Sequence, residues 1–341
     1  MKLRFFEPPL DQKAGGLDAA IESLRSALES LGHEVQINAS APVRGEADAV
    51  HFHGLWQRNF PSLATACRRE GIPYVVSPHG MLEPWARRKK WWKKWPYFHL
   101  VEKRWIGGAA FVLATAEPEA ARLRDIFPRS RIEALPLGLT ADQRPDYTAA
   151  RSRLGWNPDE MVLLFLSRIH EKKGLDMLLA ALAGLQGTVP PATRLVIVGP
   201  DEQAHYAAQC REFIAQNAAC LPRTDWIGPV WGDERWPYFQ GADLFCLPTH
   251  SENFGLAVLE ACQVGTPALT TTGTPWAGSL GSGRGFIARP DVADIRTQLS
   301  RFFSKPRITS EERAALSTWA WNNYDWATLA PRYAALYSGL R

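Results

Sequence analysis

Long hydrophobic segments are missing from this sequence of 341 residues. No uninterrupted apolar run approaches the roughly 18 residues that a membrane-spanning helix needs. The N-terminal stretch MKLRFFEPPL also lacks the apolar core of a signal peptide. We therefore expect a cytoplasmic protein without a transmembrane helix.

Paired cysteines and closely spaced aspartates are missing as well. The five cysteines are odd in number and never have C-x-x-C spacing, which argues against a disulfide framework and against a zinc site. No D-x-D triplet occurs, so a common carboxylate pattern for holding a divalent cation is absent. We predict neither a bound metal nor a cofactor.

Alternation of apolar runs with amphipathic stretches is the main pattern that is present. It runs through residues 1–145, weakens in the proline-containing polar stretch 144–160, which we interpret as a linker, and restarts at MVLLFL. Alternating β and α segments predict a parallel sheet with helices on both faces. The length exceeds what one hydrophobic core usually serves. We predict an α/β protein with two Rossmann-like domains, residues 1–145 and 156–318, whose loops face each other across a cleft.

Two glutamates stand eight positions apart in HSENFGLAVLE, between a buried strand and a helix. The start of that helix, from Asn253 through Phe254 and Gly255 to Leu256, offers backbone N–H groups that suit a phosphate. Glu252 and Glu260 would accept hydrogen bonds from hydroxyls at the two ends of a nucleotide-linked sugar. The spacing alone leaves open that Glu252 caps the helix and that Glu260 is a solvated helix position.

A basic loop, FLSRIHEKKG, follows the first strand of the second half. Arg168 and Lys173 would lie at the same edge of the sheet as the glutamates and could neutralise a diphosphate. The alternative is an ordinary solvated basic loop.

In this order, R-x4-K-G (Arg168, Lys173, Gly174) and E-x7-E (Glu252, Glu260) resemble the motifs of glycosyltransferase family 4, whose members are retaining enzymes with the GT-B fold. The resemblance spans nearly the whole chain and includes Gly15 and Gly16 after the first strand, His79 in SPHGM and the aromatic C-terminal helices. One departure is Leu137 in PLGLT, where many members carry asparagine.

The resemblance implies an acceptor domain at 1–145, a nucleotide-sugar donor domain at 156–318, and helices at 319–341 that cross back to the first domain. It implies a retaining, metal-independent hexosyltransferase that moves a sugar from a nucleoside-diphosphate donor to a glycan or lipid-linked acceptor. Exopolysaccharide, lipopolysaccharide or other glycoconjugate biosynthesis would be its setting. A non-catalytic nucleotide-sugar-binding protein on the same fold is the alternative.

The resemblance also implies roles for single residues. Glu252 would contact the donor sugar, Glu260 the ribose, and Arg168 with Lys173 the diphosphate. The backbone of Gly15 and Gly16 would approach the phosphates or the acceptor. His79 would stabilise the transition state or hold a sugar hydroxyl, unless it is a neutral histidine bonded to the backbone. The expected catalytic set is His79, Arg168, Lys173 and Glu252.

Acceptor contacts are expected beside the histidines of the first half. Trp56 and Trp85 stand in loops near His53 and His79 and suit sugar stacking, although most tryptophans should serve packing. His51 and His53 share one face of a strand, as metal ligands could, but no third ligand is evident, and we expect a structural or acceptor-binding role for His53.

A basic tryptophan-rich segment lies in the first half. Between Arg87 and Arg104 the sequence contains eight cationic residues and one acidic residue. Cations attract anionic lipid and indoles settle at headgroup depth, so we predict contact with the inner face of the plasma membrane. A solvated basic helix is the alternative, and we do not expect nucleic acid. The segment comprises Arg87, Arg88, Lys89, Lys90, Trp91, Trp92, Lys93, Lys94 and Trp95.

Overall fold

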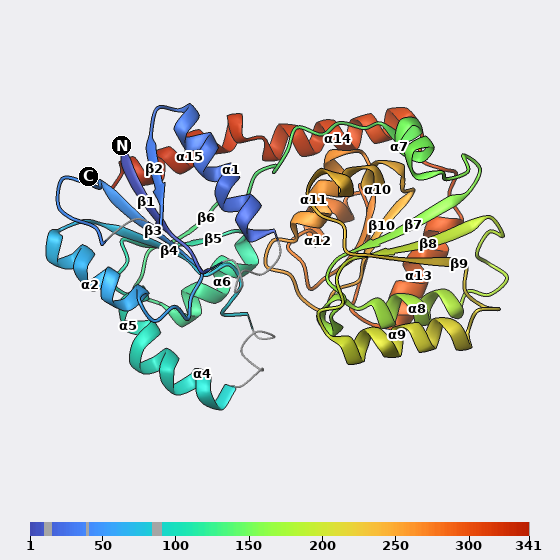
Figure 1. Ribbon diagram of the computed structural model, residues 1–341, viewed down its shortest axis with the longest axis horizontal. Helices are drawn as coiled ribbons and strands as arrows, with labels where there is room; N and C mark the ends of the chain where they lie inside the picture. Colours follow the sequence, from blue (N-terminus) through green and yellow to red (C-terminus); the bar gives the residue numbers. More distant parts are fainter. Residues whose placement is uncertain (10–15, 39–40, 84–90, 341) are drawn as a thin grey trace. The chain divides into compact units, whose positions relative to one another are not determined.

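The computed structural model describes residues 1–9, 16–38, 41–83 and 91–340, and of Trp91, Lys93 and Lys94 it describes the backbone. The chain divides into two compact units (Figure 1). Unit 1 comprises Met1–Thr140 and Tyr324–Arg341, and unit 2 comprises Ala141–Asn323.

Unit 1 is an α/β layer structure around a parallel sheet. Its described strands have the order β2-β1-β3-β4-β5-β6, and every neighbouring pair is parallel. The elements are β1 (Lys2–Phe6), α1 (Leu17–Ser30), β2 (Glu34–Ile37), β3 (Ala49–His53), α2 (Phe60–Glu70), β4 (Tyr74–Ser77), α4 (Trp91–Tyr97), the π-helix η2 (Phe98–Glu102), α5 (Lys103–Ile106), β5 (Phe111–Ala114), α6 (Glu117–Ile126), β6 (Ile132–Ala134) and α15 (Trp326–Ser338).

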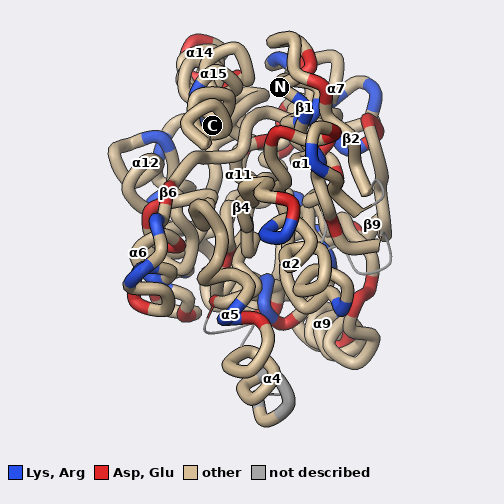
Figure 2. Tube along the Cα trace, turned by 90° about the vertical axis from the view of Figure 1, so that its left-hand side faces the viewer, with Lys and Arg blue, Asp and Glu red and all other residues tan. Residues whose placement is uncertain are grey.

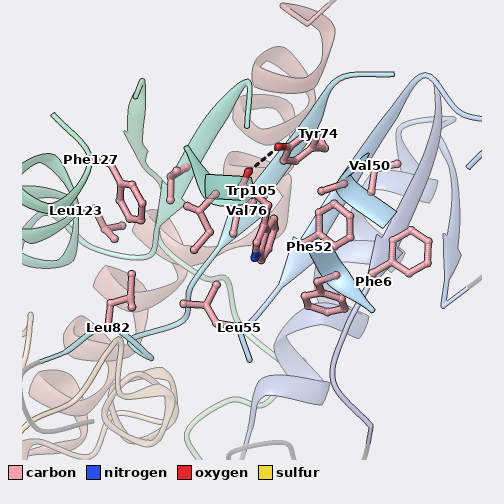
Figure 3. Close-up of a cluster of buried hydrophobic side chains, with 14 of the residues drawn as sticks. Phe6, Val50, Phe52, Leu55, Tyr74, Val76, Leu82, Trp105, Leu123 and Phe127 are labelled. Carbon is pink, nitrogen blue, oxygen red and sulfur yellow. Dashed lines mark hydrogen bonds between the residues drawn. The ribbon is translucent and has the colours of Figure 1, made fainter. Parts of the chain in front are cut away.

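The two faces of the unit 1 sheet bury separate cores because successive strand residues point to opposite faces. Phe6 and Phe52 pack with side chains of α2, α5 and α6. Figure 3 shows this core, in which the Tyr74 hydroxyl donates to the carbonyl of Trp105 at 2.6 Å. Phe5 faces the other way and packs with α1 and α15. The C-terminal helix therefore completes the core of the N-terminal sheet.

Unit 2 repeats the architecture. In its described residues the strand order is β12-β11-β10-β7-β8-β9, again with parallel neighbours. The elements are α7 (Tyr147–Leu154), β7 (Met161–Leu166), the 3-10 helix η3 (Glu171–Lys173), α8 (Leu175–Ala183), β8 (Thr193–Val198), α9 (Ala204–Gln216), β9 (Arg223–Gly228), the 3-10 helix η4 (Gly232–Arg235), α10 (Trp236–Gly241), β10 (Leu244–Leu247), α11 (Leu256–Gln263), β11 (Ala268–Thr271), α12 (Ala277–Gly281), β12 (Phe286–Ala288), α13 (Val292–Phe303) and α14 (Ser310–Tyr324).

Helices cover both faces of the unit 2 sheet. Figure 1 shows α8, α9 and α13 on one face and α10 and α11 on the other, and the contacts of α8 with α9 and α13 agree. The predicted α/β class with two parallel sheets is confirmed.

The polar stretch 144–160, which we interpreted as a linker, instead contains a helix that belongs to unit 2. Residues 147–154 form α7, which packs on α10 within unit 2. The buried guanidinium of Arg151 donates to the carboxylate of Asp243 at 2.7 Å. A polar sequence thus forms a packed helix because its charge is paired inside the unit, a contact that an apolar pattern does not reveal.

Candidate functional site

The loops that carry the predicted donor residues of unit 2 lie at one edge of its sheet. Strands β7 and β10 are parallel neighbours, but the chain leaves β7 toward β8 on one side and β10 toward β11 on the other. Such a reversal of strand order opens a crevice at the carboxyl ends of the strands, where α/β proteins bind ligands. The basic loop follows β7 and the HSENF loop follows β10.

Lys173 and Glu252 form an ion pair between these two loops. Lys173 Nζ lies 2.6 Å from Glu252 Oε1, and the two side chains are only 12% and 11% exposed. Thr249 Oγ1 donates to the same carboxylate oxygen at 3.0 Å. Burial disfavours the ionised carboxyl, but the positive charges of Lys173 and Lys172 and these hydrogen bonds outweigh it, so the pKa of Glu252 lies below its usual value. Glu252 is therefore an ionised, fixed carboxylate.

Backbone contacts hold the two loops together. The amide of His250 donates to the carbonyl of Lys172 at 2.8 Å. Gly174 follows with φ 72, and a Cβ at that position would stand 2.2 Å from the carbonyl oxygen of Pro248. Only glycine therefore lets the basic loop approach the end of β10 this closely.

Arg168 forms an ion pair with a residue that was not among the predicted site residues. Its Nη1 lies 2.6 Å from both carboxylate oxygens of Glu202, in the loop after β8, and both side chains are about one-third exposed. Arg168 and Lys173 thus come from one loop but contact different carboxylates. Sequence reasoning missed Glu202, because no motif marks it.

The start of α11 is fixed by a tryptophan. Gly255 is the N-cap residue with φ 79, and no side chain caps the helix, so the alternative that Glu252 is the helix cap is wrong. The indole N–H of Trp276 donates to the carbonyl of Phe254, and the two rings lie 5.1 Å apart. The amide oxygen of Asn253 is buried and has no hydrogen bond with any described residue. Leu256 begins the helix.

Glu260 lies inside α11 and is 9% exposed. Its Oε1 accepts a hydrogen bond from Arg235 Nη2 at 2.8 Å. The alternative of a solvated helix position is therefore wrong. Arg235 belongs to η4 and was not singled out from the sequence, because its contact with Glu260 depends on the tertiary fold.

His51, His53 and His79 form a group around the ends of β3 and β4, in which His51 and His53 are buried. His53 Nδ1 lies 3.1 Å from His79 Nε2. Burial lowers the pKa of His79 to about 4, so its imidazole is neutral near pH 7. His51 contacts Tyr337 Oη at 2.8 Å and Ser77 Oγ at 2.7 Å, and burial with the nearby His79 holds its pKa well below its usual value. His51 thus serves the packing of α15 on the sheet.

No cluster of three or more His, Cys, Asp or Glu side chains able to hold a metal ion occurs among the residues described. His51 and His53 lie on the same face of β3, as the sequence predicted, since their ring centroids are 3.9 Å apart. Both ring nitrogens of His51 are engaged by protein groups.

The other residues predicted in unit 1 are only partly described. Gly16 is the N-cap of α1 with φ 81. Trp56 has φ 69, and its amide donates to Glu102 Oε1 at 3.2 Å. Trp92 and Trp95 are exposed on α4. Gly15, Trp85 and the cations Arg87, Arg88, Lys89 and Lys90 lie outside the described residues, as do the side chains of Trp91, Lys93 and Lys94.

Solved structures share this two-unit fold. Sucrose-phosphate synthase from Thermosynechococcus elongatus is 17% identical, with a TM-score of 0.78 over 100% of this chain and 99% of that chain. Anabaena HepE, in complex with UDP and glucose, is 17% identical with a TM-score of 0.76 over 99% of this chain and 100% of that one. These likenesses define the fold as GT-B.

The family is defined by the sequence. Residues 146–320 match the family described as Glycosyl transferases group 1, and residues 39–138 match the Glycosyl transferase 4-like domain. The chain therefore belongs to the group 1, family 4-like glycosyltransferases, which confirms the resemblance and supports a hexosyltransferase. The D-inositol 3-phosphate glycosyltransferase of Pseudarthrobacter chlorophenolicus is 29% identical over 73% of this chain, and the chain spans 60% of that relative's length.

Proposed function

We propose that this chain transfers a hexose from a nucleoside-diphosphate sugar to an acceptor, with retention of the anomeric configuration and without a metal ion. The observation that carries the proposal is the largely buried Lys173–Glu252 pair, which joins the loops after β7 and β10 and lies a few residues before the start of α11. Cation, carboxylate and helix N-terminus are the groups that a sugar diphosphate requires.

The ion pair can serve both ends of the scissile bond. The ammonium group of Lys173 has three N–H donors, so it can donate to a phosphate oxygen while it keeps its bond with Glu252. As the sugar–phosphate bond breaks, negative charge grows on the leaving diphosphate and positive charge on the sugar. Lys173 and Arg168 stabilise the first charge, and the ionised Glu252 stabilises the second.

The resemblance to the family supplies the remaining donor contacts of the proposal. Glu260, held by Arg235, binds the ribose, and the amides at the start of α11 bind phosphate oxygens. The neutral His79 holds a hydroxyl of the transferred sugar. A UDP-sugar is the donor that we propose, because HepE, which shares the fold, was solved with UDP and glucose. A glycan or lipid-linked acceptor in glycoconjugate or polysaccharide biosynthesis completes the proposal.

A donor screen tests this function. UDP-glucose should raise the melting temperature of the purified chain more than GDP-glucose or ADP-glucose, since a ligand at 100 times its dissociation constant adds about 2.7 kcal/mol of stability. NMR of the released sugar should show the donor's anomeric configuration, and EDTA should leave the rate unchanged. The Glu252→Gln variant is the control for background hydrolysis. Loss of activity with EDTA and its rescue by magnesium would contradict the metal-independent mechanism. Binding without turnover would identify a nucleotide-sugar-binding protein instead.

We also propose that α4 brings the protein to an anionic membrane surface. Trp92 and Trp95 are 61% and 56% exposed, and Leu100 in η2 is 71% exposed. Figures 1 and 2 both show α4 extending away from the body of unit 1. The sequence adds six cations between Arg87 and Lys94, a composition that suits anionic headgroups. Among the helices that the structure describes, none is long and apolar enough to cross a bilayer.

Vesicle sedimentation tests the membrane proposal. The chain should sediment with phosphatidylglycerol vesicles and much less with phosphatidylcholine vesicles. Replacing both Trp92 and Trp95 with alanine should weaken this binding. Trp231, which is 68% exposed in unit 2, offers a matched control, and Trp231→Ala should bind as the wild type does. Equal binding by all three proteins would remove α4 as the membrane contact.

A further inference from the structure

The turn after β4 carries His79 in an unfavourable backbone conformation. His79 has φ 49 and the next residue, Gly80, has φ 72. This left-handed region is uncommon for a residue with a side chain. The turn is closed by a hydrogen bond from the amide of Met81 to the carbonyl of Pro78 at 3.1 Å. Since local preference does not favour the conformation, contacts from elsewhere must hold it.

Glu119 of α6 holds this turn. Its Oε1 accepts a hydrogen bond from the amide of Gly80 at 2.7 Å. Its other oxygen accepts from the amide of Thr115 at 2.8 Å and from the hydroxyl of Thr115 at 3.1 Å. Glu119 is 3% exposed. An ionised carboxylate offers only acceptors, and so it matches three donors that converge on it.

Capping of α6 explains only part of this arrangement. A glutamate in the first turn of a helix often accepts from a backbone N–H at the helix start, and the bonds with Thr115 are of this kind. The bond with Gly80 is different, because it joins α6 to a turn 39 residues earlier in the chain. It fixes the residue next to His79.

An ion pair between side chains also joins the same turn to α6, and in it Glu83 contacts Gly80 through the backbone, since the Glu83 amide donates to the Gly80 carbonyl at 3.0 Å. Arg122 Nε lies 3.0 Å from Glu83 Oε1, and Glu83 is 5% exposed. Both Glu83 and Glu119 are thus buried carboxylates at the contact between α6 and the turn, so the chain offers a matched control.

We infer that Glu119 is a positioning residue for His79: by holding the Gly80 amide, it fixes the turn that places the His79 imidazole against His53. The inference rests on the proposed function only for the consequence that a misplaced imidazole slows sugar transfer. The placement itself does not depend on any ligand.

Spectroscopy tests the placement. The full chain is labelled with ¹⁵N-histidine, and the ring nitrogens of His79 are assigned among the eight histidines with a His79→Gln variant. Glu119→Gln should shift the ring signals of His79 and His53 more than those of His51, which is held by Tyr337 and Ser77. Glu83→Gln should leave all of them in place. Unshifted His79 signals in Glu119→Gln would overturn the inference.

Kinetics with UDP-glucose separate the inference from the proposed function. A misplaced reacting group can cost about 100-fold in rate, so Glu119→Gln should lower kcat by about 10- to 100-fold while the dissociation constant of UDP is unchanged. Glu83→Gln should keep the wild-type kcat. Shifted His79 signals with an unchanged kcat would support the positioning by Glu119 and contradict the role of His79 in transfer.

A second variant tests the inference if Glu119→Gln does not fold. Glu119→Asp keeps the charge but is one methylene shorter and should shift the same two histidines. If both variants unfold, hydrogen exchange of the wild type decides. The Gly80 amide should exchange as slowly as the Thr115 amide, and fast exchange of Gly80 would overturn the inference.

Discussion

At the scale of single residues, the two glutamates of HSENFGLAVLE have separate environments and should have separate effects. Glu260 is held by Arg235 and Glu252 by Lys173. Calorimetry with UDP distinguishes them, because UDP contains the ribose but no transferred sugar. Glu260→Gln should lower the affinity for UDP by about 10-fold, the scale of a hydrogen bond to a charged group. Glu252→Gln should not lower it. Equal losses would contradict the assignment of one glutamate to each end of the donor.

The two cations of the basic loop should differ in their effect on stability. Lys173→Ala leaves the buried carboxylate of Glu252 without its partner, which should cost roughly 3 kcal/mol at pH 7. Arg168 and Glu202 are each about one-third exposed, and Arg168→Ala should cost less than about 1 kcal/mol. Urea denaturation measures both.

The loss of stability caused by Lys173→Ala should depend on pH in one direction. The pKa of Glu252 is lowered in the folded state, so its ion pair adds stability above the unfolded pKa. That stability is lost as the pH falls through the folded pKa. The difference between the wild type and Lys173→Ala should therefore shrink in acid. A difference that grows in acid would mean that Glu252 is not the group that responds.

At the scale of elements, the π-helix η2 places a buried carboxylate beside the predicted acceptor loop. Glu102 is fully buried and accepts hydrogen bonds from the indole of Trp105 at 2.9 Å and the amide of Trp56. Burial raises the pKa of Glu102 to about 7, although these two hydrogen bonds lower it. The widened turn of a π-helix often marks a functional position, and here it carries Glu102 toward the loop of Trp56.

Titration of Glu102 should be visible in the stability of the protein. A raised folded pKa adds stability that is complete below the unfolded pKa and lost as the pH rises through about 7. Glu102→Gln has no such proton, so the wild type should lose on the order of 3 kcal/mol relative to this variant between acid and neutral pH. Denaturation curves across that pH range measure the difference. A constant difference would show that Glu102 keeps an ordinary pKa.

The elements also show how far the sequence could predict the structure. Buried strands such as Leu244–Leu247 were predictable because their apolar runs end in polar loops. β6 was missed, since Ile132–Ala134 is short and only half-buried. The order of the strands was enough to predict that the loops after β7 and β10 lie at one edge of the sheet. It did not predict that Glu202 pairs with Arg168 or that Arg235 pairs with Glu260. Their contacts join segments that no sequence spacing connects.

At the scale of the whole molecule, charge is concentrated in one segment. The net charge is +4, and between Arg87 and Arg104 eight cations stand against one acid. Without that segment the chain would be negatively charged. Electrostatic attraction to the proposed membrane surface should therefore come from this segment alone, with the exposed Trp92 and Trp95 adding apolar contact.

Salt should separate the two contributions to membrane binding. The screening length falls from about 10 Å at 0.1 M salt to about 3 Å at 1 M, so sedimentation with phosphatidylglycerol vesicles should weaken strongly across this range. Replacing Lys89, Lys90, Lys93 and Lys94 with glutamine removes four of the eight cations and should therefore reduce the salt dependence and weaken binding at low salt. The Trp92→Ala/Trp95→Ala protein should bind less at every salt concentration but keep the wild-type slope, because its charge is unchanged. A lysine variant with the full wild-type slope would place the attraction outside this segment and contradict the charge argument.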